Sequence, residues 1–446
     1  MEPAQEGERG QLPKPFTPQQ TRDLILNLTQ PTVFNHMVSD WPASAWNVDY
    51  LSSVLRDNLL CFRIGRKVLN TEPQFETHCS YISGTLGQFQ KWVGGTSQDD
   101  WGSFSDYDHS EYWAYADYKY LAVVFKDQAE MLQDVVWADF GFPGRDGKES
   151  SLWVGSFGAN TPCHVDSYGC NLVLQVEGRK TWHLFPPEDT PYMYPTRIPY
   201  EESSIFSKVN IVKPDQSRFP LFSRASPHVV TLHPGQVLFV PQHWWHYVQS
   251  VDDITVSINS WIELDSDHEF RVQEAITRTL VCLFKSVDPR STLDWLNPTE
   301  DEVPSHQTNM QYLSRSVAAY AEHHKQEQQS SDSCPGNSGP KKRKTGKDAK
   351  AAEDVSLPSA PFGPFLTPVL PIPKGTNLGR VENSLADKQQ NASTEIQPHP
   401  MVKAYDSSPG QSNSGRIISS DEVMDCLVDP RVIQLVTELL LQRHNP

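Results

Sequence analysis

The sequence predicts a mainly β core with flanking helices, an α+β fold, and three observations support this prediction. Short apolar runs beside turn signals are typical of buried strands, as in residues 237–240, which follow a Pro-Gly turn. Residues 171–176 and 179–187 have the pattern of two strands separated by a Glu-Gly break of the hairpin type. Helical signals lie near the two ends: a capping box at residues 17–20 and apolar side chains at helical spacing after residue 266.

Three polar side chains from two distant segments form a candidate metal site. Side chains at positions i and i+2 of a strand point to the same face, so His164 and Asp166 can bind one ion if residues 161–167 are extended. His246 ends the motif Pro-Gln-His-Trp-Trp-His and would complete a set of two histidines and one carboxylate, which suits non-haem Fe(II) and oxygen chemistry. Without His246, a hydrogen-bonded surface pair would be the better interpretation of His164 and Asp166.

A lysine in the second predicted strand indicates an anionic ligand. Lys180, Trp182 and Leu184 share one face of that strand because side chains alternate along it. An inward-facing ammonium group is costly unless it meets an anion. A dicarboxylate bound to the metal would supply that anion.

Three segments resemble the JmjC-type 2-oxoglutarate oxygenases, and the small hydroxylase branch most of all. They are Asn-Thr-Pro-Cys-His-Val-Asp at residues 160–166, Gly-Arg-Lys at 178–180 and Phe-Val-Pro-Gln-His-Trp-Trp-His at 239–246. The resemblance covers roughly residues 15–290. It implies a double-stranded β-helix (jelly-roll or cupin) core and a dioxygenase that uses Fe(II) and 2-oxoglutarate.

The resemblance also implies a role for each site residue. Two histidines and an aspartate would bind iron, a lysine and a threonine would bind the distal carboxylate of 2-oxoglutarate, and two asparagines and a tyrosine would lie near the cosubstrate. From the tyrosines of residues 112–120 we choose the last one. The residues are His164, Asp166 and His246 for the metal, and Thr161, Lys180, Asn171, Asn259 and Tyr120 for 2-oxoglutarate.

One departure from the pattern leaves an alternative open. Between Asp166 and Gly178 the chain has one residue more than the asparaginyl hydroxylase of this branch. Alignment on Gly178 keeps Lys180 in register. If the extra residue falls in the strand instead, Arg179 is the alternative partner of the anion.

Charge and composition restrict the substrate. The net charge of −17 disfavours nucleic acid, because binding to a phosphate backbone depends on clustered lysine and arginine. A protein or peptide substrate fits better. The chain shows none of the zinc or reader modules that accompany large demethylases, so a peptidyl hydroxylase is favoured over a histone-lysine demethylase. The member that the whole chain resembles is associated with a small heat-shock protein, so the competing role is a catalytically silent adapter that binds such a protein.

Targeting features favour the cytoplasm. The charged start lacks the apolar region of a signal peptide, and no stretch approaches the ~18 apolar residues of a membrane span. The seven cysteines are scattered without any Cys-x-x-Cys motif, which indicates a reducing compartment. The run Lys341-Lys342-Arg343-Lys344 resembles a nuclear-import signal, and a solvated charge run is the equal alternative.

Changes in composition and in the helix and strand signals divide the chain into six regions. We expect the helices of the fourth region to pack on the barrel or to form a homodimer, and those of the last to return to the core or bind a partner. The linker holds a basic segment and a Pro-rich apolar stretch at 357–373, which we interpret as a docking peptide. The regions are a disordered N-terminus (1–14), a helical and strand region that completes the core (15–120), the double-stranded β-helix (121–265), C-terminal helices (266–325), a disordered linker (326–417) and C-terminal docking helices (418–446).

Overall fold

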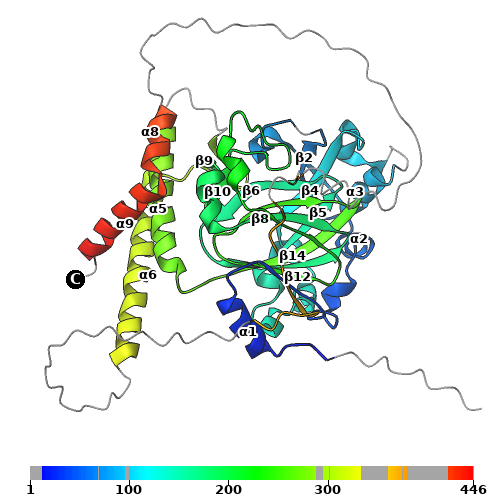
Figure 1. Ribbon diagram of the computed structural model, residues 1–446. Coiled ribbons are helices and arrows are strands. Elements are labelled where there is room, and N and C mark those ends of the chain that lie inside the picture. The colour runs from blue at the N-terminus through cyan, green and yellow to red at the C-terminus, as the bar shows by residue number, and fades with distance from the viewer. Residues whose placement is uncertain are drawn as a thin grey trace, which may run out of the picture.

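Two antiparallel β-sheets form the body of the protein, and a group of long helices lies beside them (Figure 1). The computed structural model describes residues 13–68, 70–95, 100–287, 295–300, 302–332, 360–373, 376, 378 and 420–444. This arrangement is the mainly β, α+β fold that the sequence predicts.

The larger sheet has nine strands, and each pairs with its neighbours antiparallel. Its edge strands come from distant parts of the chain. In spatial order the strands are β15 (Leu366–Pro368), β1 (Thr32–Phe34), β12 (Val237–Val240), β7 (Cys170–Glu177), β14 (Ile254–Ile262), β5 (Ser151–Ser156), β4 (Tyr112–Tyr120), β2 (Leu60–Arg66) and β3 (Ser80–Gly84).

The smaller sheet has six strands, and it carries the residues of the predicted metal site. Its pairs are also antiparallel. In spatial order the strands are β11 (His228–Leu232), β8 (Lys180–Phe185), β13 (Trp245–Ser250), β6 (Asn160–Asp166), β10 (Ser204–Ser207) and β9 (Pro195–Glu201).

The helices fall into an N-terminal and a C-terminal group. The predicted capping box opens the first helix: Gln20 N donates to Thr17 Oγ1 at 3.3 Å, and Thr17 N donates to Gln20 Oε1 at 2.9 Å. The N-terminal group is α1 (Pro18–Asn27), α2 (Val48–Leu55), α3 (Leu86–Val93) and α4 (Leu121–Val124), and the C-terminal group is α5 (Asp267–Val287), α6 (His306–Asp332), α8 (Ser420–Leu427) and α9 (Pro430–His444).

The hairpin predicted around the Glu-Gly break is wrong, although both of its strands exist. β7 pairs with β12 and β14 in one sheet, whereas β8 pairs with β11 and β13 in the other. Gly178 has a φ of +61°, and a Cβ at this position would lie 2.2 Å from Ile254 O. The glycine therefore carries the chain from one sheet to the other. A local Glu-Gly signal indicates a turn, but it cannot indicate which distant strands will pair.

The linker prediction is wrong for residues 360–373, which lie on the body of the protein. β15 pairs antiparallel with β1, and Val369 N donates to Pro31 O at 2.9 Å. Leu366 and Val369 are buried there. The apolar stretch thus docks on its own chain and covers a sheet edge that would otherwise expose unpaired backbone groups. α6 also runs to Asp332, past the predicted boundary at residue 325.

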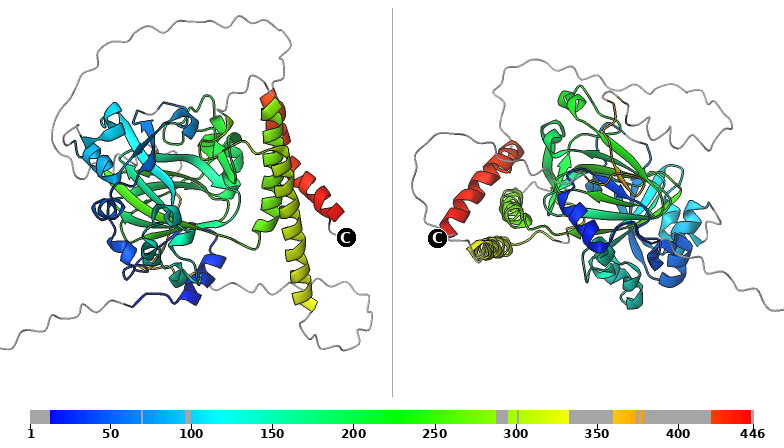
Figure 2. Two further views of the ribbon diagram at one scale, coloured as in Figure 1. Left: turned by 180° about the vertical axis from the view of Figure 1, so that it is seen from behind. Right: turned by 60° about the horizontal axis from the view of Figure 1, so that its bottom comes forward.

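The C-terminal helices pack on one another and on β9. Figure 2 shows α5 and α6 side by side with α9 crossing them. Ile433 of α9 is buried in one cluster with Val272 and Ile276 of α5. Glu274 of α5 joins the helices to β9, because it forms an ion pair with Arg197 and accepts a hydrogen bond from Tyr200 Oη at 2.9 Å. Of the two alternatives for the last region, residues 420–444 return to the protein itself.

Three predicted features lie outside the described residues: the first twelve residues of the disordered N-terminus, most of the linker predicted at 326–417, and the basic run Lys341-Lys342-Arg343-Lys344 within that linker. Among the helices that the structure does describe, none combines the length and the apolar character needed to cross a membrane.

Candidate metal and cosubstrate site

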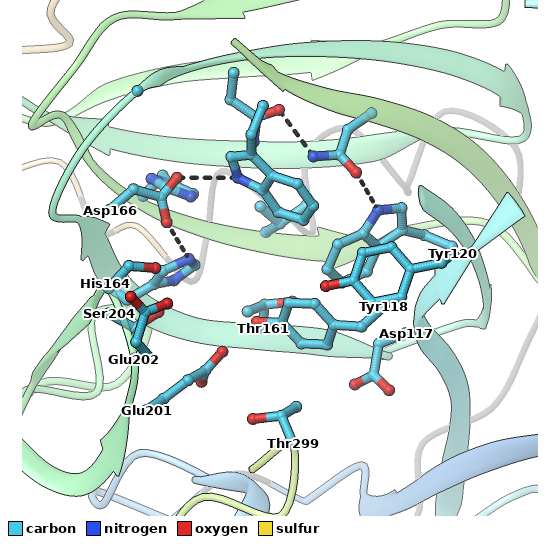
Figure 3. A pocket seen from close by; sticks show the side chains of 18 of the residues that line it. Asp117, Tyr118, Tyr120, Thr161, His164, Asp166, Glu201, Glu202, Ser204 and Thr299 are labelled. Carbon is cyan, nitrogen blue, oxygen red and sulfur yellow. Dashed lines mark hydrogen bonds and ion pairs between the residues drawn. The ribbon is translucent and has the colours of Figure 1, made fainter. Parts of the chain in front are cut away.

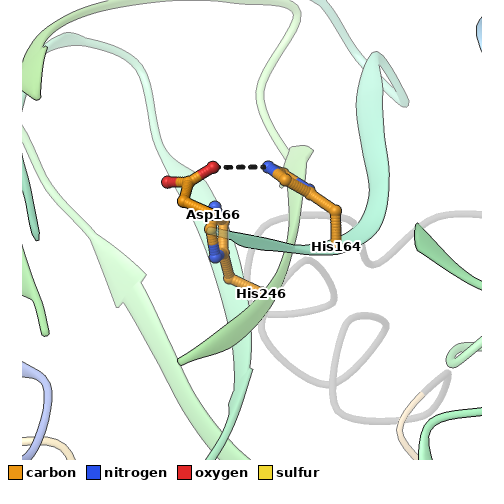
Figure 4. Close-up of side chains that lie close together, drawn as sticks. All are labelled: His164, Asp166 and His246. Atoms are coloured by element: carbon orange, nitrogen blue, oxygen red, sulfur yellow. Dashed lines mark ion pairs between the residues drawn. The ribbon is translucent and has the colours of Figure 1, made fainter. Parts of the chain in front are cut away.

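The three predicted metal ligands come together, although they are about 80 residues apart in sequence. β6 carries His164 and Asp166, and β13 pairs with β6 so that His246 lies directly opposite His164. Their potential ligand atoms lie within 4.8 Å of one another, and the His164 Nε2 to Asp166 Oδ1 distance is 3.7 Å (Figure 4). The strand alternation that predicted a common face for His164 and Asp166 is therefore correct.

Backbone carbonyl groups orient both histidines. His164 Nδ1 lies 2.9 Å from Pro162 O, and His246 Nδ1 lies 3.0 Å from Trp244 O. A proton on Nδ1 can be donated to each carbonyl, which leaves Nε2 with a lone pair for a metal. Burial, with a further contribution from the nearby His246, lowers the pKa of His164 to about 4. His164 is thus neutral near pH 7, which is the state that binds metals.

Three tryptophans hold the ligand strands in place. Trp261 Nε1 of β14 donates to Asp166 Oδ2 at 3.3 Å. The adjacent tryptophans of the predicted motif are anchored to two different segments: Trp244 Nε1 donates to Thr29 O at 3.0 Å, and Trp245 Nε1 donates to Thr190 Oγ1 at 2.9 Å. These bonds fix the strand that carries His246 to two different segments of the chain.

Lys180 is a buried cation with only neutral hydrogen-bond partners. It is 2% exposed, and its Nζ lies 2.7 Å from Ser257 Oγ and 3.1 Å from Tyr115 Oη. Within the described residues no carboxylate lies within 4.0 Å of this Nζ. Burial lowers the pKa of Lys180 to about 7, against the opposing effect of Asp117. A bound anion would restore the charge of this group.

A second donor on the cavity wall lacks an acceptor. Trp182 is 5% exposed, and its Nε1 has no hydrogen-bond partner among the residues described. Buried N–H groups are nearly always paired in proteins, so an acceptor from a ligand is the natural complement. Together, the two histidines, the aspartate, the buried lysine and the unpaired Trp182 N–H fit a divalent iron with a dicarboxylate beside it.

The predicted asparagines also meet in this cavity. Asn259 Nδ2 donates to Asn171 Oδ1 at 2.9 Å, and Trp153 Nε1 donates to Asn259 Oδ1 at 2.7 Å. Both asparagines line the same cavity as Thr161 and Lys180, and its volume is ≈ 1010 Å³. Figure 3 shows Thr161 between the His164 side and the aromatic side of this space.

Both the predicted Tyr120 and Tyr115 line the cavity, but Tyr115 is the tyrosine that lies beside Lys180. Tyr120 is 57% exposed at the outer part of the cavity, whereas Tyr115 is buried and contacts Lys180. The ladder between β4 and β5 shifts register between Ala116 and Lys119, and Tyr118 there has a φ of +51°. This bulge breaks the simple alternation of side chains, so counting along the strand could not identify the inward tyrosine.

The structure also decides between the two candidate anion partners. Arg179 points away from the cavity and forms an ion pair with Asp252 at 2.7 Å, so Lys180 is the inward residue. Sequence reasoning missed Ser257, which lies on the same face of β14 as Asn259 and Trp261. The alternation of side chains along a strand was a signal that could have found it.

Comparison with known proteins defines the class of protein. The model of a cupin-like domain matches residues 18–268, so the chain belongs to the cupin-like domain family, as its JmjC-type motifs and jelly-roll sheets predict. More specific similarity extends over nearly the whole chain. It is 48% identical to HSPB1-associated protein 1 of Bos taurus and 47% identical to that of Homo sapiens, in both cases over 98% of this chain and 96% of the relative. A more distant relative is lysine-specific demethylase 8 of Danio rerio, 29% identical over 54% of this chain and 55% of that protein.

Proposed function

We propose that this protein is an Fe(II)- and 2-oxoglutarate-dependent oxygenase that hydroxylates a protein or peptide. One observation carries the proposal: Lys180, a buried cation without a carboxylate partner among the described residues, lines the same cavity as a set of two histidines and one aspartate. The metal set suits iron, and the lysine suits the far carboxylate of a dicarboxylic acid.

Fe(II) and 2-oxoglutarate, when bound, would supply the oxidation: one atom of O₂ enters a C–H bond of the substrate as a hydroxyl group, and the other enters the succinate that forms as 2-oxoglutarate loses CO₂. His164, Asp166 and His246 would hold the metal and leave one side of it open. Lys180, with Thr161 beside it, would fix the cosubstrate.

An aromatic part of the cavity wall would shield the reacting atoms from water. Trp153, Trp182 and Trp261 are largely buried and line it together. A dry site strengthens the attraction between Lys180 and a carboxylate, because the effective dielectric constant is lower than in water. It also limits side reactions of the activated oxygen.

The test is succinate formation by the full chain with Fe(II), O₂ and 2-oxoglutarate. We expect His164→Ala and Asp166→Ala to reduce turnover at least about 100-fold, because each removes a metal ligand. His233→Ala is the matched control, since His233 is exposed and lies outside the cavity. Equal succinate formation by the wild type and both ligand variants would contradict the proposal.

A second candidate role follows from the names of the relatives, which describe association with HSPB1. In this role the protein is a silent adapter for a small heat-shock protein. The same variants separate the two roles. An adapter without catalysis would form no succinate in any form, and it would bind the purified small heat-shock protein equally well with and without Asp166→Ala. The name of the more distant relative describes a third function, lysine demethylation. A demethylase would release formaldehyde from methyl-lysine peptides.

A further inference from the structure

The candidate metal ligands lie at the end of a strand pair, where the backbone ladder does not hold all three of them. β6 and β13 pair antiparallel up to His164 and His246, and in the described part of the chain this pair is the one closest to Asp166. The other edge of β6 pairs with β10, where Ser204 lies opposite Asp166. The position of Asp166 relative to His246 therefore depends also on contacts beyond the ladder between β6 and β13.

Two turns meet beyond this end of the ladder, and we call them the ligand turns. They are residues 167–169, which follow Asp166, and residues 241–244, which lead to the strand of His246. If the register of the ladder continued by three positions, Ser167 would lie opposite His243. The backbone does not continue as a strand there, because His243 has a φ of +64°, in the left-handed region.

The His243 side chain makes a bond where the ladder has stopped. Its Nε2 lies 3.0 Å from Ser167 O, so the ring N–H can donate to this carbonyl across 76 positions of sequence. The ring also packs edge-to-face on Phe270 of α5, with the ring centroids 4.5 Å apart. A left-handed backbone is costly for a residue other than glycine, and it persists where the surroundings enforce it. The contacts of the His243 ring supply such surroundings.

The first turn of α5 adds a second link between the ligand turns. Asp267 is 2% exposed, and its Oδ1 accepts from Gly169 N at 2.9 Å and from Gln242 Nε2 at 2.8 Å. Its Oδ2 accepts from Leu264 N at 2.8 Å, which fixes the carboxylate itself. One buried side chain thus holds both ligand turns from outside the two sheets.

These links act on the atoms next to the ligands. Ser167 is covalently bonded to Asp166, and His243 is three residues from His246, so a shift of either turn moves a ligand. Metal sites keep their ligand distances within about 0.2 Å, and a site whose supporting contacts are loose binds its metal poorly. The bond between the turns therefore bears on the metal and not only on the stability of the fold.

We propose that His243 is a positioning residue of the metal site, which clamps the turn after Asp166 to the turn before His246. This inference rests on the metal site of the oxygenase function proposed above. His243 acts through the ligands, since the described group of potential ligands contains His164, Asp166 and His246 and not His243. The first histidine of the Pro-Gln-His-Trp-Trp-His motif thus orients the site that the second one completes.

The clamp also connects the C-terminal helices to the metal site. The cupin-like match ends at residue 268, whereas Phe270, which supports the His243 ring, lies beyond it. Val272 and Ile276 of the same helix are buried against Ile433 of α9. The geometry of the metal site therefore depends on a helix that belongs to neither sheet.

The test is a titration of the full chain with Co(II), whose absorption bands report the coordination geometry as well as the affinity. His243→Phe keeps a ring against Phe270 and removes the N–H group. His243→Asn suits the left-handed backbone and is too short to reach Ser167 O. We expect both variants to bind Co(II) about tenfold more weakly than the wild type and with altered bands, as loss of an outer contact of a metal site weakens binding about 10- to 100-fold.

A conservative variant separates the hydrogen bond from the packing. In His243→Gln the amide nitrogen lies about as far along the side chain as the histidine Nε2, so it can donate to Ser167 O. We expect it to bind Co(II) within about threefold of the wild type. His233→Phe is the matched control, because His233 is exposed and lies outside the cavity, and it should bind Co(II) as the wild type does.

Two results would overturn the inference. The first is an unchanged Co(II) affinity and spectrum in His243→Phe and His243→Asn. The second is an affinity of His243→Gln as low as that of His243→Phe, which would assign the effect to packing alone. Because asparagine tolerates a positive φ, His243→Asn keeps the test valid if His243→Phe does not fold.

The two proposals can fail separately. Equal Co(II) affinity of the wild type and Asp166→Ala would count against the metal site, and with it against the oxygenase function. Co(II) binding that depends on Asp166, together with full affinity in His243→Phe and His243→Asn, overturns the positioning role alone.

Discussion

The cavity has a cosubstrate wall, with His164, Lys180 and Ser257, and an acid wall, and the two are built in different ways. The acid wall consists of Glu76, Asp117, Glu201, Glu202 and Glu300. The cosubstrate wall comes from regular strands, because His164, Lys180 and Ser257 lie on β6, β8 and β14 at positions that strand alternation dictates. The acid wall is of mixed origin: Asp117 and Glu201 lie in β4 and β9, whereas Glu202 lies in the turn between β9 and β10 and Glu300 lies in the segment after α5. Regular strands give precise geometry for a metal and a small acid, whereas connecting segments can vary with the substrate.

The buried ionisable groups of each wall also affect the free energy of unfolding. Lys180 is a buried cation with only neutral hydrogen-bond partners, and Glu76 and Glu201 are buried acids whose pKa values are raised, chiefly by burial. Both walls are therefore expected to reduce the stability of the empty protein and to regain it when a ligand of opposite charge binds. Variants that remove these groups make the comparison measurable.

The largest effect is expected from Lys180→Met. Because burial lowers the pKa of Lys180 from 10.5 to about 7, the unfolded chain binds more protons than the folded protein between these values. The wild type should lose stability as the pH falls from 10.5 to 7, by on the order of several kcal/mol. Lys180→Met should remove this loss, so the empty variant should be more stable than the wild type at pH 7 in urea unfolding.

The same variant should lose the cosubstrate. Without the ammonium group, the affinity for 2-oxoglutarate in the presence of Mn(II) should fall at least about 100-fold. Lys126→Met, which changes an exposed lysine outside the cavity, is the control for both measurements. A variant that is destabilised at pH 7, or that still binds 2-oxoglutarate tightly, would show that Lys180 is not the anion partner.

A smaller effect is expected from Trp261→Phe. The substitution removes the N–H group that donates to Asp166 Oδ2 and keeps an aromatic ring in the wall. Loss of such an outer partner should weaken metal binding about 10- to 100-fold, measured by titration with Mn(II). Trp101→Phe is a suitable control because Trp101 lies outside the cavity. Unchanged metal affinity would mean that strand geometry alone orients Asp166.

The metal set could be predicted from the sequence because local rules determine it. His164 and Asp166 share a face because side chains alternate along a strand. His246 ends a motif with two adjacent tryptophans, which comes after a predicted strand and indicates specific packing. Lys180 was found in the same way. Pairing between distant strands could not be predicted, so the Glu-Gly break was taken for a hairpin, and residues 360–373 were taken for a docking peptide within a disordered linker and not for a strand of the sheet.

The acid wall could not be predicted from the sequence either, for a related physical reason. Glu76 and Glu201 are 125 positions apart and lie in no shared motif, and they meet through long-range packing. Isolated glutamates are common on any acidic surface, so nothing local distinguishes these two. Their burial, which raises their pKa values, becomes visible only in the folded protein.

The smallest effect separates two tyrosines and tests the bulge in β4. Tyr115→Phe removes a hydroxyl 3.1 Å from Lys180 Nζ, and loss of one hydrogen bond of this kind should weaken 2-oxoglutarate binding about 3- to 10-fold. Tyr120→Phe removes an exposed hydroxyl and should leave that affinity within about twofold. A stronger effect of Tyr120→Phe would mean that the inward position of β4 lies after the bulge, so that the cosubstrate wall extends toward the acid wall along this strand. The expected order instead places the boundary between the two walls at the bulge itself, which lies between Ala116 and Lys119.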